Sequence, residues 1–437
     1  MSNGTGEGVI RKVTWRLLPV AMLLFFISLL DRTNISFAAL EMNKDLGLSL
    51  AQYGTAASIF FVGYFLFEIP SNFALERVGA RLWLSRIMVT WGLVVVAMTF
   101  VQGATSLYVV RFLLGVAEAG LLPGLLLYLG LWLPAGQRGV AYATLLSTTA
   151  IAYAIGGPFT TLLMDYSLFG LRGWQTMFMV QGVLTVVIGV ALPFMLPNYV
   201  KDALWLTADE KGWLQGRLAA EEADKKVVGA TTLQQGFLDP RVLMTTVTCF
   251  FLVCANFGTV FFLPQILRPS FPALSNIQIS LLISLAFAIG GIAGIIYGRH
   301  SDRTGDRKWH IVISALIATA GYAFAAVAPT PIFQFVGICV GVLGIWSIFG
   351  VFWAYAGDLL GGAAAAGGLA FVNSVGSIGG VVAPNVLAYA RQQTGSFSGS
   401  LLALAAFALI TGILAASLKA LPNRAPDRSP VAARSAS

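Results

Sequence analysis

Four charged residues stand inside stretches of this chain that are otherwise apolar. Asp31 and Arg32 interrupt the stretch 15–38, and Arg111 and Glu118 lie in the stretch 106–132. On one helix, Arg111 and Glu118 would share a face two turns apart, roughly 10 Å along the axis. Because a charge in a hydrocarbon layer costs at least about 2.5–3.5 kcal/mol, charged residues in such stretches indicate a functional site.

The four charges sum to zero, so an empty site that contains them is neutral. An arriving carboxylate would make the site negative, and a proton on Asp31 or Glu118 would restore neutrality. Burial disfavours an ionised carboxyl group and a nearby arginine favours it, so occupying the arginine with an anion frees a carboxylate to bind a proton. This arrangement predicts proton-coupled anion uptake. The alternative is a neutral salt-bridge network that only locks helices together.

The elements that must position these charges are membrane spans. The chain has 437 residues, of which 57% are hydrophobic and 11% charged, about half the charge of a soluble protein. About 20 apolar residues form a helix that crosses the hydrocarbon core. The expected spans are 15–38, 52–75, 82–102, 106–132, 139–163, 175–197, 242–267, 276–298, 310–328, 332–357, 364–390 and 399–418.

This pattern predicts an all-α polytopic membrane protein with twelve transmembrane helices in two pseudo-symmetric six-helix halves. We expect an N-terminal half over 1–197, a cytoplasmic linker over 198–241, a C-terminal half over 242–418 and a disordered cytoplasmic tail over 419–437. The stretch 207–226 of the linker is amphipathic, which is typical of a helix on a membrane surface. The apolar run that follows the basic N-terminus has no small-residue cleavage site after it, so we expect the first span to be retained.

Lysine and arginine set the expected orientation, because cytoplasmic loops carry an excess of them. With the N-terminus inside, 21 of the 27 basic residues lie in cytoplasmic segments and four on the opposite side. Both termini are therefore expected in the cytoplasm, in a multi-pass protein of the cell inner membrane. The basic residues are dispersed over separate loops, which argues against nucleic-acid binding.

Two short loops repeat a pattern of acid, arginine and glycine at equivalent places in the two halves. Glu76, Arg77 and Gly79 lie between the second and third spans; the second copy consists of Asp302, Arg303 and Gly305, between the eighth and ninth. The glycines allow a tight turn, and the acid can pair with a neighbouring helix end and so favour one conformational state. A solvated basic loop is the alternative. Duplicated halves of this kind place the substrate site at their interface near the bilayer midplane.

The remaining reactive residues do not predict an enzyme. Cys249, Cys254 and Cys339 lie within apolar spans, without the spacing of a disulfide framework or a metal site. The histidines His300 and His310 lie in a loop and at a helix start. We expect no metal, no cofactor and no catalytic residues. The expected partners are a small organic acid anion, a co-transported cation and the lipid bilayer, with the protein a monomer.

Several short sequences in order along nearly the whole chain carry a family resemblance. They are Leu30–Ile35, Gly63–Asn72, Arg111-Phe112 with Gly115 and Glu118–Gly120, Phe262–Leu267, Phe352–Ala354, the small-residue run 363–368 and Asn373–Gly376. In this order they resemble the anion:cation symporters of the major facilitator superfamily. That branch includes sugar-acid, tartrate, phthalate and other aromatic-acid permeases. The resemblance implies the major facilitator fold and import of an organic anion with a cation, for which we expect a proton.

The resemblance also implies roles for individual residues of the first half. Arg32 and Tyr64 would hold the substrate carboxylate. Asp31 and Glu118 would carry protons, and Arg111 would couple these two acids.

In the second half, the resemblance implies that Trp353 and Asn373 touch the rest of the substrate; the alternative for Trp353 is a packing aromatic. The chain departs from the sugar-acid carriers at two places. Thr149 stands where they place a glutamine, and Val351-Phe352 replaces small hydroxyl residues before Trp353. These departures favour a less hydroxylated or aromatic acid.

Two other functions are alternatives. A proton-coupled drug efflux antiporter of the same superfamily would resemble its relatives in a longer glycine pattern on the fifth span, of which only Gly157-Pro158 is present. Two buried arginines also suit anions better than lipophilic cations. A non-transporting membrane solute sensor is the other alternative, although the sequence contains no soluble signalling domain.

Overall fold

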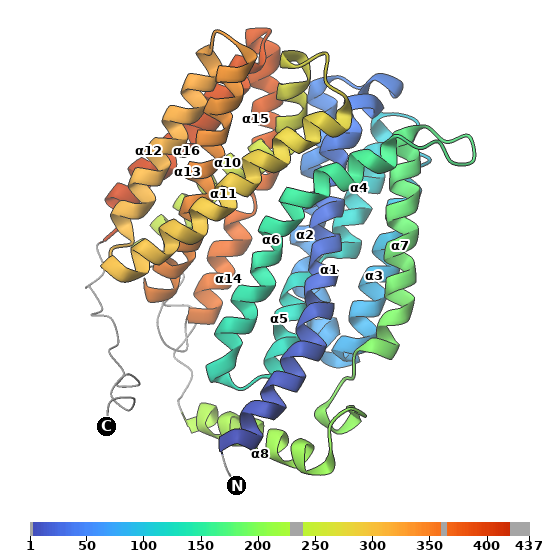
Figure 1. Cartoon of the computed structure of the whole chain (residues 1–437), viewed down its shortest axis with the longest axis vertical. Coiled ribbons are helices and arrows are strands. Elements are labelled where there is room, and N and C mark those ends of the chain that lie inside the picture. Colours follow the sequence, from blue (N-terminus) through green and yellow to red (C-terminus); the bar gives the residue numbers. More distant parts are fainter. Residues whose placement is uncertain (1–2, 228–238, 360–364, 420–437) are drawn as a thin grey trace. The chain divides into compact units, whose positions relative to one another are not determined.

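The computed structural model describes residues 3–227, 239–359 and 365–419, and this part of the chain is helical without strands (Figure 1). The first eight helices are α1 (Asn3–Asp45), α2 (Leu50–Val78), α3 (Ala80–Met98), α4 (Ala104–Glu118), α5 (Leu121–Trp132), α6 (Ala135–Met164), α7 (Gly173–Met195) and α8 (Ala208–Val227). The later helices are α10 (Pro240–Ser270), α11 (Asn276–Thr304), α12 (Lys308–Val327), α13 (Pro331–Leu359), α14 (Ala365–Gly376), α15 (Gly379–Thr394) and α16 (Phe397–Ser417). Twelve segments of the described chain are long and apolar enough to cross a membrane, which confirms the predicted number.

Two of the predicted spans are not single helices. The span expected over 106–132 breaks at Ala119 and Gly120 into α4 and α5. Gly120 has a φ of +87°, a left-handed conformation that side chains other than glycine disfavour. The span expected over 364–390 likewise divides into α14 and α15. Mean hydropathy does not register such breaks, because it is averaged over a window and the residues at each break are uncharged.

The chain forms two compact units. The first contains Met1–Ala230, Phe257–Ala288 and Ser377–Ser400; the second contains Thr231–Asn256, Ile289–Gly376 and Leu401–Ser437. Helices α1 to α8 belong to the first unit, together with α15 and parts of α10 and α11. The division into two six-helix halves is a statement about sequence duplication and stays a prediction.

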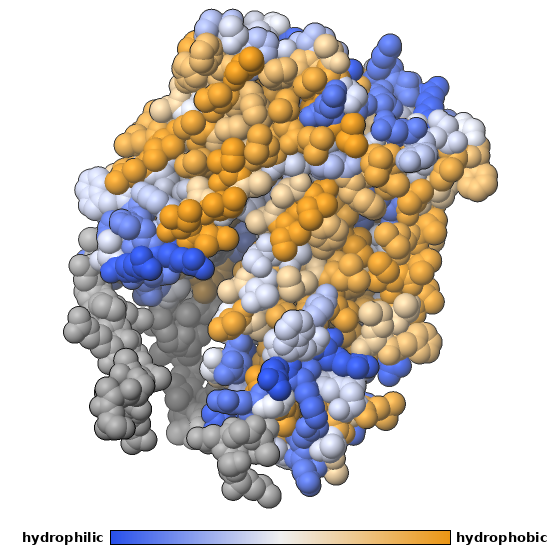
Figure 2. Space-filling model, in the orientation of Figure 1, coloured by the Kyte–Doolittle hydropathy of each residue, from blue (hydrophilic) through white to orange (hydrophobic). Residues whose placement is uncertain are grey.

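Within the first unit, α3 and α7 pack through glycines. A Cβ atom added at Gly182 would lie 2.8 Å from the carbonyl oxygen of Gly92, so the two backbones are in direct contact. The opposite face of α7 exposes large apolar side chains at helical spacing, including Val187, Val190 and Phe194. Figure 2 shows hydrophobic side chains along α7 and hydrophilic ones around α8. An apolar exposed face and a small-residue packing face are what a lipid-embedded helix requires.

In the second unit, α12 and α13 pack in the same way. An added Cβ atom at Gly321 would lie 2.9 Å from the Cα atom of Gly341, and one at Gly344 would lie 2.6 Å from the carbonyl oxygen of Ser314. The close approach of these backbones provides van der Waals contact where the hydrophobic effect provides none.

The amphipathic linker helix predicted over 207–226 is present as α8, and it attaches to the rest of the first unit. It lies beside the N-terminal end of α1 (Figure 1), where Lys12 donates a hydrogen bond to Glu210. Glu221 accepts a hydrogen bond from the backbone N–H of Ala135 (2.9 Å), at the start of α6. The linker is therefore held at both ends of α8. The tail predicted over 419–437 lies outside the described residues except for Lys419.

Candidate functional site

The structure brings the predicted charged residues of the first half together. Arg32 on α1 and Glu118 at the end of α4 form an ion pair with 2.6 Å between Nε and Oε1. The Ser28 hydroxyl donates a second hydrogen bond to the same Glu118 oxygen (2.7 Å). Glu118 and Asp31 are buried, as is Arg111. Charge-assisted hydrogen bonds are about twice as strong as neutral ones, so this pair connects α1 firmly to α4.

Close packing of α2 against α4 makes this arrangement possible. Gly63 and Gly115 face each other across the two helices: an added Cβ atom at Gly115 would contact the carbonyl oxygen of Phe60 and lie 2.8 Å from the Tyr64 nitrogen. One at Gly63 would contact the carbonyl oxygen of Phe112. The absence of a side chain at Gly115 therefore permits the close approach of α2 and α4.

The face of α2 next to these glycines supplies aromatic rings to both arginines. The Arg32 guanidinium carbon lies 4.7 Å from the ring centre of Tyr64 and 5.6 Å from that of Phe60. The corresponding distance from Arg111 to Phe60 is 5.0 Å. Phe60 thus contacts two like charges, and cation–π contacts in desolvated sites contribute on the order of 2 kcal/mol each. Arg111 also donates from Nε to the Ala56 carbonyl oxygen (3.1 Å).

Several polar atoms of this cluster are buried without a hydrogen-bond partner among the described residues. They are Arg32 Nη2, Arg111 Nη1 and Nη2, Glu118 Oε2 and Asp31 Oδ2. Leaving a buried polar group unpaired costs about 1–3 kcal/mol, and more for a charged one. Donors of both arginines are therefore available to an oxyanion, and an oxygen of each acid is available to a proton or a donor.

Asp31 belongs to a chain of neutral polar side chains that the sequence did not indicate. Asn34 Nδ2 donates to Asp31 Oδ1 (3.0 Å) and to Gln181 Oε1 (3.0 Å), and Gln181 Nε2 donates to the Thr160 hydroxyl (3.2 Å). The chain connects α1 through α7 to α6, and its members are buried. The available signal was Gln181 itself, a polar amide in the uncharged stretch 175–197.

The two predicted residues of the C-terminal half lie in the second unit. Trp353 on α13 is half-buried, with its ring centre 5.5 Å from that of Phe352 in an edge-on contact. Asn373 on α14 is exposed. Their contact with the substrate stays a prediction. Thr149 on α6 is half-buried, and the neighbouring Thr148 is buried.

The first of the two repeated loops forms the turn between α2 and α3. Glu76 and Arg77 are exposed. Gly79 has a φ of +93° and separates the two helices. The Asn198 side chain accepts a hydrogen bond from the backbone N–H of Arg81 (2.9 Å) and lies against Gly79. The segment that follows α7 therefore supports this turn.

The second loop, between α11 and α12, contains an ion-pair network. Asp302 accepts a hydrogen bond from Arg307, whose Nε lies 3.7 Å from Asp358 at the end of α13. Gly305 has a φ of +69°, and Arg303 is exposed. The expected link to a neighbouring helix end is thus made by Arg307, whereas the acid Asp302 pairs within its own loop. The role of either loop as a conformational switch stays a prediction.

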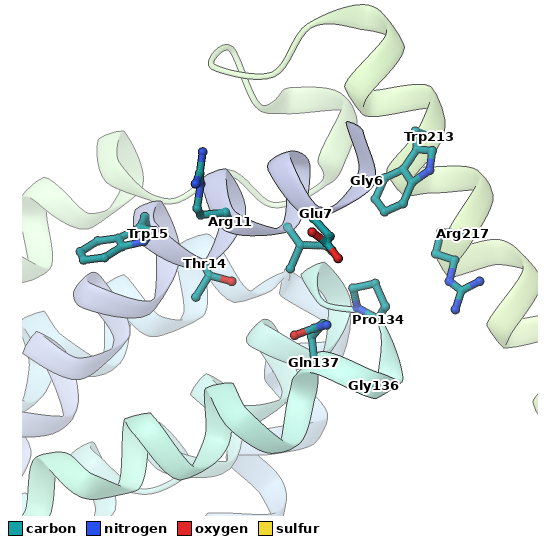
Figure 3. A pocket seen from close by; sticks show the side chains of 11 residues that line it. Gly6, Glu7, Arg11, Thr14, Trp15, Pro134, Gly136, Gln137, Trp213 and Arg217 are labelled. Atoms are coloured by element: carbon teal, nitrogen blue, oxygen red, sulfur yellow. The ribbon is translucent and has the colours of Figure 1, made fainter. Parts of the chain in front are cut away.

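A cavity of about 580 Å³ lies apart from the charged cluster, between α1, α8 and the turn that precedes α6 (Figure 3). Glu7, Thr14, Gln137, Trp213 and Arg217 are among its lining residues. It contains none of the predicted site residues and reflects the attachment of α8 to α1.

At that attachment, hydrogen bonds from Lys12 and from the backbone N–H of Thr207 hold the pKa of Glu210 below its ordinary value of 4.5.

Comparison with known proteins agrees with this fold. The sequence model of the Major Facilitator Superfamily matches residues 21–384. A protein of Agrobacterium vitis named "Putative tartrate transporter" is 40% identical over 95% of this chain and 92% of its own length. The "Quinolone resistance transporter" of Acinetobacter baumannii is 35% identical over 90% of this chain and 91% of its own.

Among solved structures, a bacterial homologue of the human lysosomal transporter Spinster superposes with a TM-score of 0.77. It is 15% identical and covers 96% of this chain and 98% of its own, so it supports the fold alone. The family consists of membrane transporters rather than enzymes. The family model and the long relatives above 30% identity together show that this chain belongs to the Major Facilitator Superfamily.

Proposed function

We propose that this protein imports a small organic carboxylate together with a cation, a proton, by alternating access. The observation that carries the proposal is the ion pair between the half-buried Arg32 and the buried Glu118, in which Nη2 of the arginine and Oε2 of the acid have no partner among the described residues. Arg32 also lies over the Tyr64 ring, so a carboxylate that binds Nη2 would lie beside this aromatic side chain. The relatives named as tartrate transporters support an organic acid as substrate.

The charge balance supplies the mechanism. A substrate carboxylate that binds Arg32 competes with Glu118 for the guanidinium group, and the displaced Glu118 then accepts a proton. Asp31 offers a second proton position near Arg111 and Glu118. One proton on Asp31 or Glu118 for each carboxylate bound keeps the occupied site uncharged, which lowers the cost of moving it through a low-dielectric layer. Arg111, whose two terminal nitrogens have no hydrogen-bond partner among the described residues, couples the two acids.

The remaining assignments complete the proposal. Trp353 and Asn373 contact the part of the substrate away from the carboxylate, and the two repeated loops stabilise one state of the cycle. The protein lies in the inner membrane as a monomer with both termini in the cytoplasm.

Uptake into proteoliposomes tests the proposal. The panel of substrates contains tartrate, a sugar acid and benzoate. Each substrate is supplied under three conditions: a lower pH outside the vesicles, an inward sodium gradient, or no gradient. We expect concentrative uptake of one substrate only when the external pH is lower, and no uptake by the Arg32→Ala variant. Equal uptake under all three conditions would contradict proton coupling.

Export is a second candidate function, which the relative named as a quinolone resistance transporter favours. The same vesicles distinguish it. An exporter with a proton antiport mechanism would drive substrate towards the acidic side, whereas the proposed importer moves substrate away from that side.

A further inference from the structure

We infer that Asn34 and Gln181 make Asp31 a proton-binding site, with Asn34 accepting the proton's hydrogen bond and Gln181 acting as a positioning residue. This inference rests on the proposed proton coupling and extends it to residues outside the charged cluster. It is carried by the hydrogen bonds of the buried chain Asp31–Asn34–Gln181–Thr160 and by two atoms of that chain that have no partner among the described residues.

The first step is a count of donors and acceptors. Both hydrogens of Asn34 Nδ2 are used, one by Asp31 Oδ1 and one by Gln181 Oε1. Asp31 and Asn34 then each keep one acceptor atom that has no partner among the described residues. These atoms are Asp31 Oδ2 and Asn34 Oδ1. An ionised carboxylate has no donor to offer the amide oxygen. One proton on Asp31 Oδ2 supplies that donor, so a single proton satisfies both atoms.

The resulting pair is a carboxylic acid and a carboxamide joined by two hydrogen bonds. The amide nitrogen donates to one acid oxygen, and the protonated acid oxygen donates to the amide oxygen. No atom besides the proton has to be added, because the N–H···O half of the pair already exists in the structure. Other neighbours of Asp31 do not replace Asn34 as this acceptor: Arg32 and Arg111 carry only donors, and so does Trp91 on α3. Glu118, the remaining charged group that faces Asp31, accepts from Arg32 and Ser28 at Oε1, and its Oε2 has no partner among the described residues, so the Asn34→Leu variant below tests which oxygen accepts the proton's hydrogen bond.

Gln181 determines which way the Asn34 amide faces. If Asn34 turned over, its oxygen would meet the Gln181 oxygen, and two acceptors would face each other. In the structure Gln181 presents its Oε1 to Asn34 while its Nε2 donates to the Thr160 hydroxyl (3.2 Å), and a turn of Asn34 alone would break this match. All four side chains are buried, where an unmatched pair of acceptors is not relieved by water. The chain therefore holds the Asn34 oxygen ready for the proton on Asp31.

Two substitutions test the inference with a matched control. Gln181→Met keeps the length of the side chain and removes its hydrogen bonds, and Thr160→Val removes the last member of the chain. The control is Thr185→Val, one turn along α7, because the buried Thr185 hydroxyl donates to the backbone carbonyl of Gln181 on its own helix (2.8 Å) and not to the side chains of the Asp31–Asn34–Gln181–Thr160 chain. Size-exclusion profiles and melting temperatures establish that each variant is folded.

The first readout is the pH at which uptake into proteoliposomes is half-maximal. With Gln181→Met, the proton on Asp31 loses an oriented acceptor, so half-maximal uptake should require a pH lower by roughly one unit, a tenfold change in proton affinity. Thr160→Val should shift it in the same direction by less. Thr185→Val should leave it unchanged. A Gln181→Met profile that coincides with that of Thr185→Val would overturn the inference.

The second readout needs no transport and separates this inference from the proposed function. Infrared difference spectra of the purified protein between neutral and acid pH should contain the C=O band of a protonated carboxyl group that disappears in Asp31→Asn. In Gln181→Met and in Asn34→Leu this band should move to higher wavenumber, because the acid loses hydrogen bonds. An unmoved band would overturn the role of Asn34 and Gln181. Uptake without any dependence on the pH gradient, beside a band that moves as expected, would overturn only the transport assignment.

Discussion

Arg32 and the buried Glu118 form an ion pair between the first and fourth crossings, with 2.6 Å between Nε and Oε1. Neither side chain is fully used by the other, since Arg32 Nη2 and Glu118 Oε2 have no partner among the described residues. Because each side chain has an atom without a partner, Arg32 can bind an anion and Glu118 can bind a proton before the ion pair separates, so neither charge is left unpaired. This property distinguishes it from an ion pair that only holds two helices together.

Arg32→Ala should abolish binding of the substrate anion. A charge-assisted hydrogen bond contributes about 1.5–3 kcal/mol, so affinity should fall by at least about tenfold to a hundredfold. Calorimetric titration with the acid identified by uptake measures the change. Arg16→Ala is the control, because Arg16 lies on the same helix and stacks on Trp205 instead. Affinity within twofold of the wild type would remove Arg32 from the site.

Glu118→Gln and Asp31→Asn should separate coupling from binding. Each substitution fixes a titrating group in its neutral form, which imitates the protonated state and leaves the anion able to bind. Accumulation driven by a pH gradient should fail, whereas exchange of labelled for unlabelled substrate needs no net proton movement and should survive. Both assays use the same vesicles. Concentrative uptake driven by the pH gradient alone in both variants would make the four charges a structural network.

Gly115→Ala should destabilise the protein although alanine is the better helix former. The added methyl group would meet the α2 backbone at Phe60 and Tyr64, which cannot move aside as a side chain could, and overpacking of this kind costs about 1–3 kcal/mol. Gly350→Ala is the control, since nothing lies within 4 Å of the added atom there. Melting temperatures in detergent should fall for the first variant only. Equal values would show that α2 and α4 are not in backbone contact.

Acid should loosen α8 from α1. Because the pKa of Glu210 is lowered in the folded protein, its contact with Lys12 contributes stability above pH 4.5 that is lost as the pH falls through the lowered value. Spin labels at Gly8 and Gly216, which have open space around them, should give one narrow distance at neutral pH and a broader distribution below about pH 4.

Glu210→Gln should give the broader distribution of spin-label distances at every pH. A narrow distribution in this variant would assign the attachment of α8 to other contacts, such as Glu221 with Ala135.

A fluorescent reporter that matures only in the cytoplasm, fused after Ser437, should be bright. The reason is the excess of lysine and arginine in the loops assigned to the inside. A dark fusion of a fully inserted protein would reverse the orientation.

The sequence predicts those residues of the site whose side chains require a large free energy to enter a membrane. Asp31, Arg32, Arg111 and Glu118 stand out because a charge among apolar residues requires a partner, and the structure places them together. Gln181 did not stand out, because a neutral amide is cheap enough to occur in a span for packing alone. Its role depends on the α1–α7 geometry that brings it to Asn34, which no local pattern encodes.

The helix boundaries show the same limit. Stretches of uncharged residues predict the number of crossings, yet the break between α4 and α5 depends on the φ of Gly120, directly after Glu118. A glycine allows a helix to break but does not predict a break, since most glycines in the described part of the chain lie inside continuous helices. The roles of Trp353 and Asn373 come from family resemblance and remain predictions.

The backbone contact between α2 and α4 restricts how this site can move. No side-chain layer separates the two helices at Gly63 and Gly115, so a sliding movement would bring backbone atoms into collision. We therefore expect α2 and α4 to move as one rigid body. Tyr64 and Phe60 would then keep a fixed spacing from Arg111 and Glu118 throughout the transport cycle. The adjustable element is α1, which carries Arg32, so release of Glu118 should appear as a displacement of one helix against a stationary pair.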